Sequence, residues 1–254
     1  MGAFIMSCIL MFSTTTDVVF IYFYVISHYT EIMKKIIFHG SKDIIKKPIF
    51  GFGNKDNDYG LGFYCTENEE LAKEWAVDIN RDGYANEYEI NMHGLKVLHL
   101  KKYNILYWLA ILLENRSFTI SSPLGQEGKQ YILNNFKIDY RSYDMIIGYR
   151  ADDSYFTFAK DFVNGVISYQ QLGKAIRLGN LGEQIVLISE KAFKRIEYIN
   201  STFADRGVYY QYKGKRDESA RKQYFESRKA KRDKNDLYIM QIIDEEIKEN
   251  DPRL

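Results

Sequence analysis

Two short glycine-containing motifs constrain this chain most strongly. Residues 38–41 read Phe-His-Gly-Ser and end an apolar run, and residues 60–66 read Gly-Leu-Gly-Phe-Tyr-Cys-Thr. Glycine allows the backbone to approach a ligand closely. His39 offers a hydrogen-bond donor or acceptor, and Tyr64 offers a flat ring for stacking. Together the motifs predict two strands that line a pocket for a planar ring attached to a sugar.

Composition limits the class of protein. The chain has 254 residues, of which 46% are hydrophobic, so it can bury a substantial core. Its formal net charge of +1 gives no overall electrostatic reason to bind nucleic acid. Cys8 and Cys65 are far apart in sequence, which predicts neither a disulfide framework nor a zinc site. We therefore expect no bound metal and a reducing, cytoplasmic environment.

The first 32 residues differ from the rest of the chain. Two apolar runs are separated by a polar segment that contains Asp17, whereas a membrane-spanning helix needs about 20 consecutive apolar residues. Met33 directly precedes the first expected strand and would be a natural start. We interpret residues 1–32 as a doubtful N-terminal extension that arises from a mis-assigned start. The alternative is a membrane anchor, although no membrane partner is expected.

The remaining pattern predicts an α+β fold. Short apolar runs predict strands at 34–39, 62–65, 87–92, 96–100, 143–149, 183–189 and 196–199. A capping box, Thr66 to Glu69, predicts the start of a helix, and residues 104–114 are apolar enough for a buried helix. Helices fall irregularly between the strands, which favours α+β over a regular βαβ arrangement.

The chain divides into a main domain and a charged end. No linker interrupts residues 33–203, so we expect one domain there. Residues 204–254 are predicted to be a charged helical C-terminal appendage. Within them, residues 216–234 are typical of a solvated helix with opposite charges at i,i+4, and residues 237–247 are amphipathic.

Further motifs occur in a fixed order with the first two. They are Asp58-Tyr59-Gly60, the helix segment Ala72 to Ala76, Tyr143-Asp144 through Ala151-Asp152-Asp153, and Gln184. Over residues 35–200 this order resembles the bacterial DUF3990 family. The His-Gly-Ser and Gly-Phe-Tyr motifs are also similar to ADP-ribosyltransferases of the His-Tyr-Glu type, such as the poly-ADP-ribose polymerases. That resemblance implies a split β-sheet that binds NAD.

Carried over by position, the resemblance implies a set of NAD contacts. His39 would bond a ribose hydroxyl, the Gly40 backbone would bond the nicotinamide amide, and Ser41 would assist. Tyr64 would stack on the nicotinamide, and Trp75 would stack on its other face. The site would bind NAD as the substrate, hold it bent and stabilise a sugar cation as the nicotinamide bond breaks.

The third catalytic position has two candidates. Glu is usual in the superfamily, and polymerase-like spacing selects Glu183, whereas the DUF3990 pattern selects Gln184. Neighbouring strand residues point to opposite faces, so only one of the two should enter the cleft. An inward Gln184 could hold a hydroxyl but would bring no negative charge.

The resemblance implies an ADP-ribosyltransferase that modifies an unknown protein or nucleic acid. It also permits a toxin paired with a small antitoxin protein. The first alternative is an NAD glycohydrolase, in which water replaces the acceptor. The second is a non-catalytic NAD- or nucleotide-binding module that has lost its acidic catalyst. The side chain that faces the cleft, Glu183 or Gln184, distinguishes this module from the two enzymes.

Overall fold

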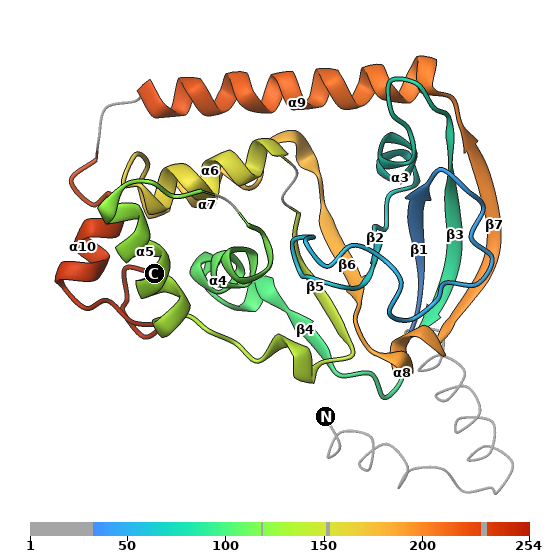
Figure 1. Ribbon diagram of the computed structural model, residues 1–254, viewed down its shortest axis with the longest axis horizontal. Helices are drawn as coiled ribbons and strands as arrows, with labels where there is room; N and C mark the ends of the chain where they lie inside the picture. The colour runs from blue at the N-terminus through green and yellow to red at the C-terminus, as the bar shows by residue number, and fades with distance from the viewer. Residues whose placement is uncertain (1–32, 118, 151–152, 230–232) are drawn as a thin grey trace, which may run out of the picture.

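Two β-sheets lie beside each other, and most of the helices gather on the far side of one of them (Figure 1). The computed structural model describes residues 33–117, 119–150, 153–229 and 233–254. The predicted N-terminal extension, 1–32, and the motif residues Ala151 and Asp152 lie outside the described residues. The mixture of separate sheets and helices confirms the predicted α+β class.

The first sheet carries the His-Gly-Ser motif. It contains β1 (Lys34–Ser41), β3 (Gly83–Asn91) and β7 (Ile196–Ala204) in the order β1-β3-β7, and both pairs are antiparallel. His39 lies opposite Asn86 in the central strand. β7 is longer than the predicted strand at 196–199, because its backbone pairs with β3 as far as Ala204.

The second sheet carries the Gly-Phe-Tyr motif. It contains β2 (Phe63–Cys65), β6 (Glu183–Leu187), β5 (Met145–Tyr149) and β4 (Val97–His99) in the order β2-β6-β5-β4. β4 runs parallel to β5, and the other neighbours are antiparallel. Every residue of β5 is buried, as expected for a strand covered on both faces.

Among the described residues, one isolated backbone bridge joins the two sheets. The Phe38 N–H donates to the Thr66 carbonyl at 2.7 Å, and the Thr66 N–H donates to the Phe38 carbonyl at 2.9 Å. Phe38 precedes His39, and Thr66 lies two residues after Tyr64. The bridge therefore brings the two motifs together, although they are separated in sequence.

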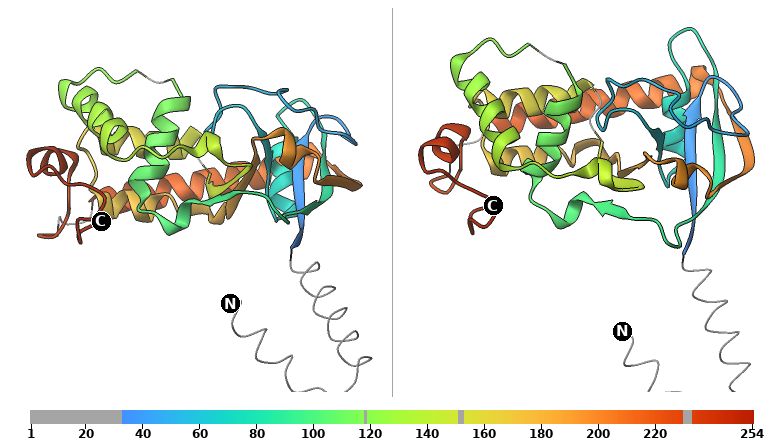
Figure 2. Two further views of the ribbon diagram at one scale, coloured as in Figure 1. Left: turned by 90° about the horizontal axis from the view of Figure 1, so that it is seen from below. Right: turned by 60° about the horizontal axis from the view of Figure 1, so that its bottom comes forward.

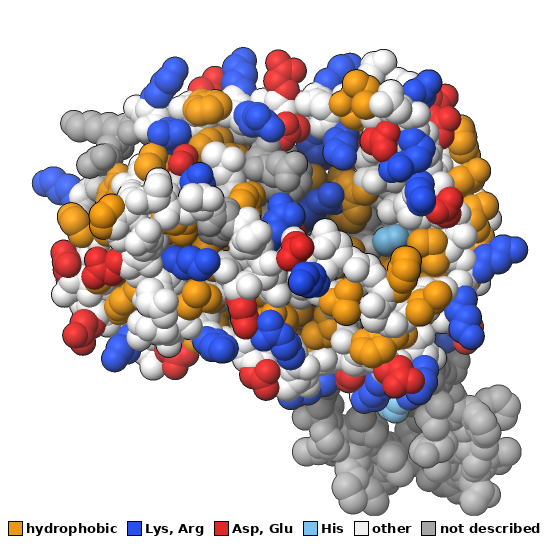
Figure 3. Space-filling model, viewed as in Figure 1, with side chains coloured by type: hydrophobic (Ala, Val, Ile, Leu, Met, Phe, Trp, Pro, Cys, Tyr) orange, Lys and Arg blue, Asp and Glu red, His pale blue; other side chains and the backbone are white. Residues whose placement is uncertain are grey.

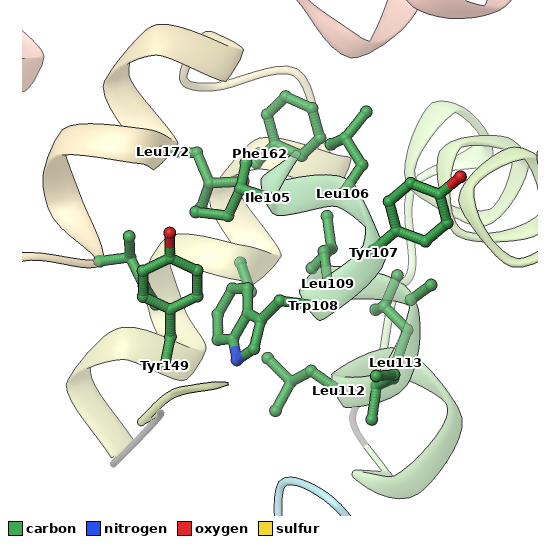
Figure 4. Close-up of a cluster of buried hydrophobic side chains, with 14 of the residues drawn as sticks. Ile105, Leu106, Tyr107, Trp108, Leu109, Leu112, Leu113, Tyr149, Phe162 and Leu172 are labelled. Atoms are coloured by element: carbon green, nitrogen blue, oxygen red, sulfur yellow. The ribbon is translucent and has the colours of Figure 1, made fainter. Parts of the chain in front are cut away.

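Helices surround the sheets. They are α3 (Glu69–Ala76), α4 (Ile105–Asn115), α5 (Pro123–Asn135), α6 (Asp153–Val163), α7 (Tyr169–Ala175), α8 (Glu190–Phe193), α9 (Arg206–Lys229) and α10 (Ile239–Asp244). The expected buried helix is α4, whose residues 105–113 are all buried. Figure 4 shows Trp108 of α4 facing Tyr149 at the end of β5, within the largest apolar cluster. This cluster fixes the end of β5 relative to the helices.

The predicted start of α3 is wrong by two residues. Asn68 caps the helix, because its side chain accepts a hydrogen bond from the Leu71 N–H. Thr66 is held in the backbone bridge with Phe38 and cannot also begin the helix. Its hydroxyl instead accepts from the Asn68 N–H at 3.2 Å, which orients the cap.

The long helix α9 runs along the molecule past both sheets (Figures 1 and 2). It begins almost directly after β7, ten residues before the predicted start at 216, and packs on α3, α6 and α7. Arg216 of α9 donates two hydrogen bonds to the carboxylate of Glu74 of α3, from Nε to Oε2 at 3.0 Å and from Nη2 to Oε1 at 2.6 Å. The charged segment is thus tied to the helix that carries Trp75.

We expect Arg216→Met to destabilise the fold by roughly 2 kcal/mol, because it leaves the carboxylate of Glu74 buried with its main counter-charge removed. The Glu74 side chain is 4% exposed and that of Arg216 is 30% exposed, so the loss should be smaller than for a fully buried pair. Urea unfolding measures it. Adding Glu74→Met should lose less than the sum of the single changes. Arg221→Met, which breaks the exposed pair with Asp217, is the control.

Candidate functional site

A pocket of ≈ 790 Å³ opens at the junction of the two sheets. His39, Gly40, Tyr64, Trp75 and Gln184 all line it, and they come from β1, β2, α3 and β6. Figure 3 shows a hollow on this face with basic side chains around it. Two other predicted site residues, Ser41 and Glu183, are not part of its lining.

His39 is held in one orientation and one tautomer. Its Nδ1 lies 2.7 Å from the Tyr64 carbonyl oxygen, and its ring stacks on Phe63. A carbonyl oxygen can only accept, so Nδ1 carries the proton. Burial lowers the pKa of His39, and the bond to Tyr64 offsets this only in part. The ring is therefore neutral at pH 7, and Nε2 is a hydrogen-bond acceptor.

Gly40 allows β1 to lie directly against α3. A Cβ atom at this position would fall 2.0 Å from the Ala72 carbonyl oxygen, which no side chain can accommodate. Because α3 also carries Trp75, the glycine sets how close that ring comes to the strand. Ser41 stabilises the following turn instead of facing the pocket. Its hydroxyl donates to the Asp43 carbonyl at 2.5 Å and accepts from Asn86 Nδ2 at 2.9 Å.

Tyr64 presents its ring to the pocket while its hydroxyl is occupied. The hydroxyl donates to the Gly60 carbonyl at 2.5 Å and accepts from the Tyr59 N–H at 3.1 Å. Burial raises the pKa of Tyr64 well above its ordinary value, so the phenol stays protonated. The ring is thus fixed to the preceding loop and offers a flat surface for stacking.

Trp75 is covered on one face by a cation. The Arg150 guanidinium carbon lies 3.3 Å from the centre of a Trp75 ring, which is a cation–π contact. The sequence predicts that Tyr64 and Trp75 stack on the two faces of nicotinamide, and it does not predict this arginine. The face that Arg150 covers is not open to a second ring, so any stacking on Trp75 must use the rest of its surface.

The strand pairing decides which residue of β6 faces the pocket. Gln184 is 6% exposed and lines the pocket, and its Oε1 has no hydrogen-bond partner among the residues that the structure describes. The Glu183 carboxylate lies on the other face, 3.4 Å from Lys101 Nζ. The pocket therefore contains the amide, and the neighbouring acid lies outside it.

Basic residues outside the motifs give the pocket its charge. Five lining side chains, Lys46, Lys47, Arg116, Arg150 and Lys213, are basic, and two, Asp43 and Asp58, are acidic. This leaves an excess of three positive charges among the described lining residues. Sequence reasoning missed these cations because they belong to a loop, two element ends and α9, with no shared spacing. The signal that could have found Arg150 is its position directly after a buried strand.

The motif residue Asp144 stabilises the fold outside the pocket. Asp144 accepts from the Lys96 N–H at 2.8 Å and from the Ser189 hydroxyl at 2.7 Å, and it lies 3.4 Å from Lys191 Nζ. It joins the start of β5 to the segments before β4 and α8, and it does not line the pocket.

The fold and the site define an α+β protein with a basic pocket between two sheets. The sequence pattern of the family described as "Protein of unknown function (DUF3990)" matches residues 35–198, and the chain belongs to this family. The expected DUF3990 membership is thereby confirmed. No curated protein and no solved structure matches the chain.

The described residues lack two further features. None of their helices combines the length and the apolar character that crossing a membrane requires. In the same part of the chain, no three His, Cys, Asp or Glu side chains are grouped so that they could hold a metal ion.

We expect His39 to make stability depend on pH below its ordinary pKa of 6.5. Because the folded state has the lower pKa, the unfolded chain binds more protons as the pH falls through 6.5. The contribution of His39 is therefore complete above 6.5 and is lost as the pH falls. Urea unfolding between pH 7 and about pH 5 measures this dependence.

The variant His39→Asn keeps a donor for the Tyr64 carbonyl and does not titrate. Its free energy of unfolding should fall less steeply with decreasing pH than that of the wild type. Equal slopes for the two proteins would show that His39 is not buried as described.

Proposed function

We propose that this chain is an ADP-ribosyltransferase-like protein that binds NAD in the pocket. It would break the bond between nicotinamide and ribose and transfer ADP-ribose to a protein or nucleic-acid acceptor. The observation that carries this proposal is the convergence of His39, Tyr64, Trp75 and Gln184 on one pocket. All four are residues that the sequence motifs predict to contact NAD.

The nicotinamide riboside half of NAD suits the polar groups of the pocket. Nε2 of His39 would accept a hydrogen bond from one ribose hydroxyl, and the free Oε1 of Gln184 would accept from another. The Tyr64 ring would stack on nicotinamide, and the backbone of Gly40 would bond its amide. A buried acceptor without a partner is unfavourable, so a hydroxyl donor at Gln184 would be stabilising.

The diphosphate of NAD suits the charge of the pocket. Its two negative charges would lie among an excess of three positive ones. Arginine binds phosphate oxygens well because its planar guanidinium offers several donors. Arg150, held over Trp75, and Lys213 of α9 both line the pocket and could contribute such donors.

The sheets also support the proposed superfamily relationship. ADP-ribosyltransferases bind NAD in the cleft of a split β-sheet, and here the pocket lies where one bridge joins two sheets. Among the alternatives, the non-catalytic binding module is favoured by one observation: the neutral Gln184 lines the pocket and Glu183 does not. An NAD glycohydrolase would use the same cleft with water as the acceptor.

Incubation of the Met33-start protein with NAD, with free nicotinamide measured over time, tests the proposal. We expect nicotinamide release, and we expect Gln184→Ala to reduce it at least about tenfold, because a hydrogen bond to the ribose is lost. Glu183→Ala changes the adjacent residue on the opposite face and should leave release nearly unchanged. Equal loss in both variants would contradict the assignment of Gln184.

Calorimetry separates binding from chemistry. We expect His39→Ala and Tyr64→Ala to lose measurable NAD binding while retaining the circular dichroism spectrum of the wild type. Binding without release by the wild type would favour the non-catalytic module. Unchanged NAD affinity in a folded double variant would falsify the site.

A further inference from the structure

The pocket lacks an acid where the proposed chemistry needs one. Breaking the nicotinamide–ribose bond leaves positive charge on the sugar, and a nearby negative charge lowers the energy of that state. Gln184 is neutral, and Glu183 lies on the other face of β6, paired with Lys101. If the site is catalytic, its negative charge must come from another element.

Only two carboxylates occur among the described lining residues, Asp43 and Asp58. The side chain of Asp43 is 71% exposed and lies 3.8 Å from Lys42 Nζ. Asp58 is 5% exposed. A carboxylate acts much more strongly on a developing charge when it is shielded from water. Asp58 is therefore the better candidate.

The surroundings of Asp58 place its charge beside the stacking ring. It lies in the turn that the Gly60 N–H closes by donating to the Asn57 carbonyl at 2.9 Å. The next residue, Tyr59, donates its N–H to the Tyr64 hydroxyl. Burial and, to a smaller extent, the charge of Asp58 raise the pKa of Tyr64. The loop that orients Tyr64 thus also carries the carboxylate.

Arg116 holds the carboxylate of Asp58 in position. Its Nε lies 3.6 Å from Asp58 Oδ1, and its guanidinium lies over the ring of Phe156. The separation is longer than in the tight Arg216–Glu74 pair, whose atoms approach to 2.6 Å. Arg116 therefore lies at ion-pair distance from Asp58, and the carboxylate remains part of the pocket lining.

We propose that Asp58 is the catalytic carboxylate of this site, which faces the sugar cation and acts as the general base that accepts the proton of the attacking nucleophile. This inference rests on the proposed function. It supplies from the loop before β2 the charge that β6 does not bring into the pocket.

The bond between the nicotinamide nitrogen and ribose C1′ breaks, and its electron pair leaves with nicotinamide, which becomes neutral. The oxygen of water or of an acceptor hydroxyl forms the new bond to C1′. Its proton passes to the Asp58 carboxylate and then to solvent. No metal, oxidant or reductant takes part.

The test compares Asp58→Asn with the wild type in the full chain, measuring NAD affinity by calorimetry and kcat from steady-state nicotinamide release at saturating NAD. We expect kcat to fall at least about 100-fold, while the Kd for NAD changes by less than about threefold. Glu114→Gln is the matched control. It removes a carboxylate paired with an arginine, Arg141 at 2.8 Å, outside the pocket lining.

Each outcome decides between the proposals. Release by the wild type and equally by Asp58→Asn overturns the role of Asp58 alone, as does a variant that loses affinity but keeps kcat. A wild type that binds NAD and releases no nicotinamide overturns the transferase function as well. If Asp58→Asn does not fold, Asp58→Glu replaces it. Its shifted carboxylate should keep NAD affinity and lower kcat at least about tenfold, and full turnover would contradict the proposal.

Discussion

The site depends on the backbone bridge between Phe38 and Thr66. Two backbone hydrogen bonds join the two sheets there, and each motif contains one of the two bridging residues. His39 then reaches the carbonyl of Tyr64, so the second motif orients the first. A pocket at such a junction has walls from both sheets, and its geometry is fixed by main-chain bonds that tolerate changes in the surrounding side chains.

Packing around the junction completes the pocket. Gly40 lets α3 approach β1, α3 carries Trp75, and Arg216 of α9 grips the residue before Trp75. The same helix α9 supplies Lys213 to the lining. The segment after residue 204, predicted as an appendage, thus contributes a side chain to the pocket lining. The dense charge pattern of this segment predicts exposure to solvent. The pattern does not predict that Arg216 bonds to α3 or that Lys213 lines the pocket.

The contiguous parts of the site could be predicted from the sequence, because glycines and aromatic residues at fixed spacing reflect the local conformation of the backbone. The two motifs, the buried helix α4 and the α+β class are of this kind. Thr66 was mistaken for a cap because its strand bridge is a long-range contact. Arg116, Arg150 and Asp58 come from three different segments, and only the folded arrangement brings them together. The choice between Glu183 and Gln184 likewise required the register of β6 against β5.

That register also limits how the chemistry of the pocket could change during evolution. A slip of β6 by one residue would bring Glu183 inward, but it would turn the buried side chains of the strand toward the wrong faces. Substitution at position 184 needs no such rearrangement, since codons for glutamine and glutamate differ by one base. Descendants of this fold could therefore gain or lose an acid on β6 in a single mutational step, with the surrounding sheet unchanged.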